Sequence, residues 1–418
     1  MKKLRAGSLQ LVTFIVVAIA ILLSSFILLI HIHRQFRLKS NLTIETVGLV
    51  NNGINGLLQN NEVHEDTVSI PLRDEGYKSL KVHRGFWGSY GKVHSRAKIK
   101  STELVKTALI GSTTLEQKSP ALYIKDNKKP LVLVGNTKIK GKAFLPERGV
   151  KSGNISGKSY YGGRFVYGLT ETSKDLPKLN TDLLDYLKDL KSGNFKVDNQ
   201  EYIELNSSKT HQNSFEDTLQ LAYSHSDIIL SNIGLTGHIV VHSRTRIVID
   251  ASAKLEDVIV VAPIIEIKPN VVGSFQAIAT ERISIDKNVT LAYPSALVLQ
   301  NDYVKDEHNG SKSIFMADHS KVSGQILVLG ETQPNNYDAQ VKISANAVVE
   351  GMIYCEQNLE LRGTVYGSVY TDHFIIKEGG SIYQNHLYNA LIDSSELPRE
   401  FVGLGFDDQK KGIAKWLY

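Results

Sequence analysis

Residues 227–299 read DIILSNIGLTGHIVVHSRTRIVIDASAKLEDVIVVAPIIEIKPNVVGSFQAIATERISIDKNVTLAYPSALVL, and this stretch decides the fold. An apolar pattern returns there every 18 residues, at Ile229, Ile247, Ile265 and Ile283. A fixed period of this length is typical of a solenoid, because one repeat cannot bury its inner face alone but stacked neighbours can. The sequence therefore predicts a mainly β fold, a parallel β-helix solenoid in which these four isoleucines form one inward row.

The repeat length drifts towards the C-terminal end of this region. Val341 and Leu359 are again 18 residues apart. Three similar fragments follow at shorter spacing and begin at Gly351, Gly367 and Gly380. Left-handed β-helices built from hexapeptide units share the 18-residue period, but their units are strict, so the drift favours the right-handed form.

A second, shorter repeat precedes the main one. Ile139-Lys140-Gly141-Lys142 is matched 16 residues later by Ile155-Ser156-Gly157-Lys158, with glycines that suit tight corners between strands. Composition and pattern then predict six segments. These are an N-terminal cytoplasmic tail and transmembrane helix at 1–37, a stalk at 38–85, a first β-rich part of the solenoid at 86–170, a short helical insertion at 171–225, the main parallel β-helix at 226–386, and a tail at 387–418 that covers the open end.

The predicted insertion carries a helical stripe. Leu183, Leu187 and Leu190 recur at helical spacing, and Asn180 or Thr181 is in position to cap the first turn. The sequence therefore predicts a helix that packs on, or caps, one end of the solenoid.

The chain from Leu9 to Ile30 is apolar except for four polar residues. About 22 residues at roughly 1.5 Å each span a hydrocarbon core of ~30 Å. A cleaved signal peptide is the alternative, but its apolar region would be only about 7–15 residues long. Basic residues flank both sides, so the positive-inside rule decides little. Because a short N-terminal tail usually stays inside, we expect a single-pass protein of the bacterial inner (cytoplasmic) membrane with the bulk of the chain outside.

Composition limits the other classes of function. The 418 residues carry a net charge of +5, and no basic stripe with interleaved aromatic residues stands out, so we expect no nucleic-acid partner. Cys355 is the single cysteine, which excludes an intramolecular disulfide and CxxC motifs. A packed thiol is its ordinary interpretation, and a lipidated or reactive thiol is the alternative.

The solenoid region holds few candidate catalytic groups. Asp250 and Asp286 lie two repeats apart, about 9–10 Å, a separation that suits an inverting pair of glycosidase carboxylates. Lys268 lies between them, so an exposed ladder of alternating charge explains the three residues better. His238 and His242 would lie about 13 Å apart on one strand, too far for a shared metal ion. We expect no catalytic, cofactor-binding or metal-binding residues and no cofactor.

The N-terminus resembles that of type IV pilin-like proteins. Lys2-Lys3-Leu4-Arg5-Ala6-Gly7 is a short basic leader that ends in glycine, and the long apolar segment follows it. Such pilins usually carry a glutamate at the fifth position after this glycine, where this chain has Val12. The resemblance implies cleavage after Gly7 and an accessory subunit of a type IV pilus or a type II secretion-like machine.

Residues 341–370 read VKISANAVVEGMIYCEQNLELRGTVYGSVY and resemble the polymer-forming, bactofilin-like domain of bacteria. This resemblance implies a structural β-helix that assembles end to end. We therefore expect a non-enzymatic, membrane-anchored scaffold or assembly component of the cell envelope, with copies of itself or other envelope or filament proteins as partners. The alternatives are the accessory pilin-like subunit and a glycan-active β-helix enzyme.

Overall fold

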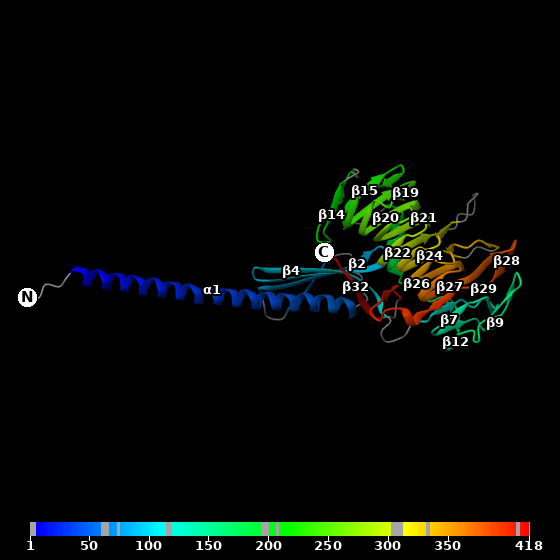
Figure 1. Cartoon of the computed structure of the whole chain (residues 1–418), viewed down its shortest axis with the longest axis horizontal. Coiled ribbons are helices and arrows are strands. Elements are labelled where there is room, and N and C mark those ends of the chain that lie inside the picture. The colour runs from blue at the N-terminus through cyan, green and yellow to red at the C-terminus, as the bar shows by residue number, and fades with distance from the viewer. Residues whose placement is uncertain are drawn as a thin grey trace, which may run out of the picture.

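The computed structural model describes residues 6–59, 67–72, 76–113, 119–193, 200–205, 209–301, 312–331, 335–406 and 410–417. The chain is mainly β and begins with a long helix, α1 (Ala6–Gln59, 54 residues). At about 1.5 Å per residue α1 is roughly 80 Å long, and its first half projects away from the rest of the molecule (Figure 1). The helix continues beyond residue 37, where the transmembrane segment was predicted to end, through the first part of the predicted stalk. The basic leader at residues 2–5 lies outside the described residues.

An antiparallel sheet lies beside the second half of α1. Its strands are β1 (Val68–Ile70), β2 (Lys78–Trp87), β3 (Tyr90–Ile99), β4 (Thr102–Thr113), β31 (Val402–Gly403) and β32 (Lys411–Leu417). β2 pairs with β3, and β3 with β4, while β31 and β32 both pair with β4. The sheet therefore joins segments from both ends of the chain.

The antiparallel sheet contains parts of two segments that were predicted to lie elsewhere in the fold. Residues 86–113 were expected in the solenoid but form antiparallel hairpins, because Gly88, at φ +60°, allows the two-residue turn that joins β2 to β3. The tail at 387–418 was expected to cover the open end of the solenoid, but its last strands extend the antiparallel sheet instead.

The second half of α1 and the antiparallel sheet share one hydrophobic core. Val50, Ile54 and Leu57 of α1 are each at most 5% exposed. They pack with buried residues of β2, β3 and β4, namely Leu80, Val82, Val93, Ala97, Ala108 and Ile110. The apolar stripe of this half of α1 is therefore buried by protein.

Most of the remaining strands form a parallel sheet, called here the parallel stack. Its strands are β5 (Leu122–Ile124), β7 (Lys138–Lys140), β8 (Ala143–Leu145), β12 (Thr170–Thr172), β13 (Glu201–Tyr202), β14 (Thr210–Asn213), β15 (Gln220–Ser224), β16 (Ile228–Leu230), β17 (Gly234–Gly237), β18 (Ile239–Ser243), β19 (Arg246–Ile249), β20 (Lys254–Ile267), β21 (Val272–Ile285), β22 (Thr290–Gln300), β23 (Ser313–Met316), β24 (Lys321–Leu329), β25 (Val341–Ile343), β26 (Val348–Leu361), β27 (Thr364–Glu378) and β30 (Leu391–Asp393). Parallel pairs also join β6 (Leu131–Val134) to β9 (Val150–Ser152) and to β29 (His386–Tyr388). Short antiparallel pairs are made by β10 (Asn154–Ile155) with β11 (Lys158–Ser159) and by β28 (Ser381–Gln384) with β27.

Three of the four predicted isoleucines form the inward row. Ile247, Ile265 and Ile283 are fully buried and pair in register from strand to strand. Ile229 is 67% exposed, and Ile228 takes its place by pairing with Ile247. The first repeat is therefore one residue longer than 18. Because side chains alternate between the two faces of a strand, this single step turns Ile229 outward.

The order of strands along the parallel stack differs from the order along the chain. β27 pairs with β5, β5 with β8, and β8 with β12, so residues 121–172 lie beyond the C-terminal strands. At the opposite end, β13, β14 and β16 pair with β15, β17 and β19 respectively. Figure 1 shows β12 and β9 at one end and β14 and β15 at the other. The segment expected at the start of the predicted solenoid therefore lies at the far end of the parallel stack.

The helix α2 (Thr181–Lys191) confirms the helical stripe in the predicted insertion. The Asn180 side chain accepts a hydrogen bond from the Leu183 backbone N–H at 3.1 Å, and Leu183, Leu187 and Leu190 are buried. The predicted limits of the insertion are too wide, because residues 201–224 form β13, β14 and β15 of the parallel stack.

Candidate functional site

The first half of α1 is a candidate membrane segment. None of the residues in its most apolar 18-residue window is buried, and the helix is long and apolar enough to cross a membrane. The prediction of an apolar anchor around residues 9–30 is confirmed to this extent. The same helix is exposed along its first half and buried against a sheet along its second, so it links a lipid-compatible surface to the folded head.

The antiparallel sheet is fixed to the parallel stack by a buried joint. The Gln276 side-chain amide donates to the Trp87 carbonyl at 2.7 Å, and its Oε1 accepts from the Ser89 backbone N–H at 2.8 Å. The Trp87 indole N–H donates to the Asp257 carbonyl at 2.8 Å. Gln276 is 3% exposed. Because these polar groups are paired out of water, separating the sheet from the stack would leave several of them unsatisfied.

His238 belongs to this joint and not to a metal site. Its ring lies 5.0 Å from the Trp87 ring and 5.1 Å from the Phe215 ring, and its Nδ1 is 3.0 Å from the Asp217 carbonyl oxygen. Burial, with the nearby Lys92 charge as a smaller cause, lowers the pKa of His238 to about 3. The His238 side chain is therefore neutral in the folded protein near neutral pH. In this state it packs against the two aromatic rings and makes one hydrogen bond.

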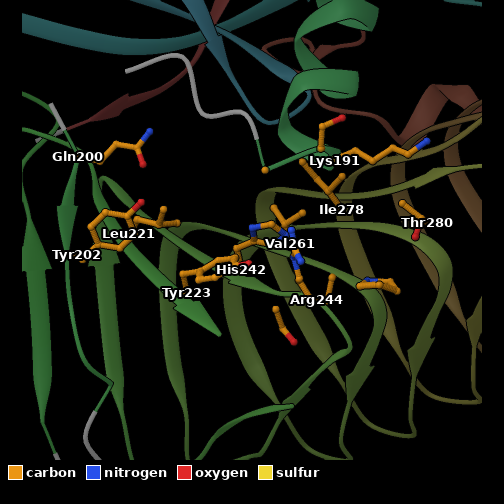
Figure 2. Close-up of a pocket in the computed structure, with 15 residues that line it drawn as sticks. Lys191, Gln200, Tyr202, Leu221, Tyr223, His242, Arg244, Val261, Ile278 and Thr280 are labelled. Carbon is orange, nitrogen blue, oxygen red and sulfur yellow. The ribbon is translucent and has the colours of Figure 1, made fainter. Parts of the chain in front are cut away.

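A cleft of about 470 Å³ lies between the end of α2 and the parallel stack. Figure 2 shows Lys191 reaching in from α2, and Tyr223, His242 and Arg244 coming from strands of the stack and their ends. The Tyr223 and His242 rings meet edge to face at 5.3 Å. The cleft thus brings together the end of α2 and several strands of the parallel stack.

The cleft has a positive character. Lys191 and Arg244 line it, and none of the described residues that line it is a carboxylate. Burial lowers the pKa of His242, and the Arg244 charge adds to this effect. Burial also lowers the pKa of Lys191. The arrangement offers hydrogen-bond donors and positive charge to a small polar or anionic molecule. His238 and His242, predicted to lie too far apart to share a metal ion, have different surroundings: His238 lies in the joint and His242 lines the cleft.

The predicted carboxylate column is present but is part of the surface. Asp250, Lys268 and Asp286 follow residues that pair in register, so they lie in one column as expected. Asp250 accepts hydrogen bonds from the Ser252 hydroxyl and backbone N–H, and these bonds lower its pKa. A carboxylate with a lowered pKa is poorly suited to act as a general acid, which supports the interpretation as a surface ladder.

The single cysteine is a packed thiol, as expected. Cys355 is fully buried on β26, and burial raises its pKa to about 12. Such a thiol is protonated and weakly nucleophilic at neutral pH. Within the described part of the chain, no group of three or more His, Cys, Asp or Glu side chains could hold a metal ion.

Sequence reasoning missed the joint and the cleft. Trp87 and Gln276 are 189 residues apart, and nothing in the local pattern around either residue indicates a contact between them. His238 came nearest to the joint: it was considered as one of two histidines for a shared metal ion, and it instead packs beside Trp87.

Comparison with known proteins gives a distant similarity among solved structures only. No protein-family model and no curated protein matches the sequence. Among solved structures, the chain is similar to the competence-associated pilin ComZ from Thermus thermophilus, with 10% sequence identity and a TM-score of 0.25. The match covers 90% of this chain and 97% of that one. At this TM-score and sequence identity, the similarity supports no inference about residues or activity.

Proposed function

We propose that this chain is a membrane-anchored, pilin-like accessory subunit that carries a large β-helical head outside the cytoplasm. The observation that carries the proposal is the division of α1 into two halves. One half is exposed and largely apolar, and the other is buried against an antiparallel sheet through Val50, Ile54 and Leu57. A helix of this kind can hold a folded head close to a membrane or to neighbouring helices in an assembly.

The head is proposed to be a parallel β-helix, of the right-handed form that the drifting repeat length favours. Parallel pairing from Ile228 through Ile247 and Ile265 to Ile283 supports this, as does the single core that the inward residues share. The head has a non-enzymatic role in the proposal, because its candidate carboxylates Asp250 and Asp286 lie in a surface ladder. Its place is the bacterial inner membrane, with the bulk outside.

The proposal explains the basic leader at the N-terminus. This leader ends at Gly7, in the first turn of α1 and directly before the apolar segment, where a prepilin peptidase would cut. Cleavage there leaves Ser8 as the new N-terminus, with a charged amino group at the end of the apolar helix. Val12 replaces the usual pilin glutamate, so any contact with a neighbouring N-terminus would lack that ion pair.

Intact-mass measurement tests this proposal. The full chain is expressed in membranes with and without a prepilin peptidase, next to a Gly7→Leu variant. We expect the peptidase to remove the first seven residues of the wild-type chain and to leave Gly7→Leu intact. An intact wild-type chain in the presence of active peptidase, shown by cleavage of a control pilin, would count against the pilin-like role and leave an uncleaved anchor.

A further inference from the structure

The core of the parallel stack is incompletely covered at both ends. The half-buried apolar residues that pack on this core lie in the segments at the two ends of the stack, in or next to its outermost strands: Ile203, Leu205 and Ile228 at one end, and Val150, Tyr160, Phe165 and Val166 at the other. The residues between the two ends bury the rest of the core completely or almost so. Each end therefore presents apolar surface that a further layer of strands could cover.

Both ends also carry strands with a partner on one side only in the described part of the chain. β12 pairs with β8, and β13 and β14 pair with β15 and β17. Their outward backbone groups are free to pair with a strand of another chain at the usual spacing of about 4.8 Å. All of these pairings are parallel, so the two ends have the same kind of edge.

The two ends differ in charge. Residues 125–178, the basic end, contain twelve Lys and Arg against four Asp and Glu, a net charge of +8. Residues 200–230, the acidic end, contain five Asp and Glu against one Lys, a net charge of −4. The net charge of the basic end exceeds the net charge of the whole chain, which is only +5. Lys151 and Arg164 at the basic end and Glu201 and Glu204 at the acidic end are exposed.

We propose that the basic end of one copy binds the acidic end of a second copy, so that the parallel stacks associate head to tail. Opposite charge favours this pairing, whereas two basic ends or two acidic ends would repel each other. The contact uses different surfaces on the two partners and does not close on itself, so it generates chains of stacks. The inference rests on the stack alone and does not require pilin-like processing.

The test uses the full chain in detergent micelles, followed by sedimentation velocity over a range of protein and salt concentrations. The basic-end variant is Lys151→Glu/Arg164→Glu, and the acidic-end variant is Glu201→Lys/Glu204→Lys. The matched control, Lys254→Glu/Lys287→Glu, makes the same charge change at exposed positions on the flank of the stack. Contacts between membrane helices are the same in all of these proteins.

We expect the wild type and the control to associate more at high protein concentration and less at high salt. Each end variant alone should weaken association at least about tenfold, because its two ends carry the same sign. An equimolar mixture of the two end variants should associate again, since each supplies the end that the other lacks. This rescue also shows that both variants are folded.

Three results would overturn the proposal. One is a wild-type chain that stays single at every concentration. Another is loss of association in the basic-end variant but not in the acidic-end variant, which would indicate that the basic end binds some other anionic surface. The last is a mixture of the two end variants that fails to associate although each shows the wild-type circular dichroism spectrum.

Discussion

Replacing Gly53 with alanine should loosen α1 from the antiparallel sheet, although alanine is the better helix former. A Cβ at Gly53 would lie 2.3 Å from the Ser95 Oγ and 3.1 Å from methyl groups of Leu80 and Val82. The Ser95 hydroxyl is buried and donates to the Val50 carbonyl at 3.1 Å, so it cannot move away without losing that hydrogen bond. The helix therefore approaches the sheet closely at this glycine.

The magnitude follows from three contributions. Overpacking of a filled core costs about 1–3 kcal/mol, and loss of the Ser95 hydrogen bond costs about 1 kcal/mol. The gain in helix propensity offsets about 1 kcal/mol of this cost. Gly56 is the matched control, because a Cβ there meets nothing within 4 Å. Gly53→Ala should therefore destabilise the packing by about 1–3 kcal/mol, while Gly56→Ala should stabilise the helix by up to about 1 kcal/mol.

Hydrogen exchange of the full chain in detergent measures this difference directly. The amides of residues 50–58 exchange when this part of α1 unfolds locally, and packing against the sheet opposes that unfolding, so their exchange rates report changes in the packing free energy. We expect faster exchange in Gly53→Ala and slower exchange in Gly56→Ala. If both variants slowed exchange equally, α1 would not pack on the sheet at Gly53, and the division of the helix into an exposed and a buried half would be wrong.

Further predictions concern the joint, the insertion and the cysteine. Because His238 has a pKa of about 3 when folded and about 6.5 when unfolded, only the unfolded state takes up this proton between those values, so stability should be lost as the pH falls below 6.5. The loss should reach about 2–3 kcal/mol by pH 4.5 in denaturant unfolding, and His238→Phe should remove this part of the pH dependence. Leu187→Ala removes a fully buried side chain of α2 and should lower the free energy of unfolding by about 2–4 kcal/mol. Asp185→Ala, at an exposed position of the same helix, should change it by less than about 0.5 kcal/mol. Equal losses of stability in the two variants would contradict the packing of α2. Cys355 should resist maleimide at pH 8 until the protein is unfolded, and rapid labelling of the folded chain would contradict its burial.

The sequence predicted those parts of the fold that depend on local pattern. Ile247, Ile265 and Ile283 occupy equivalent places because each repeat must bury one face, and the helical stripe of α2 with its Asn180 cap needs only residues close in the chain. Ile229 was misplaced because Ile228 is also an isoleucine, and residue type alone cannot show which of two neighbours faces inward.

The parts that the sequence could not show depend on long-range pairing. Residues 78–99 alternate in burial as a strand in either kind of sheet would, and only the distant tail strand β32, which pairs with β4, completes the antiparallel sheet. Gly53 is an example within α1. From the sequence alone a glycine inside a helix predicts a weaker helix, whereas in the structure Gly53 allows α1 to approach Ser95 of the sheet closely.

Disulfide formation between neighbouring strands tests most directly whether the chain forms a stack of parallel repeats in this register. Ile229 pairs with Val248, and Cα atoms of such neighbours are close enough for a disulfide. We expect Ile229→Cys/Val248→Cys to oxidise readily, as measured by loss of free-thiol labelling after denaturation. Ile229→Cys/Ile247→Cys should stay reduced, because residue 247 faces the core. Oxidation of the second pair without the first would contradict the register and the stack that depends on it.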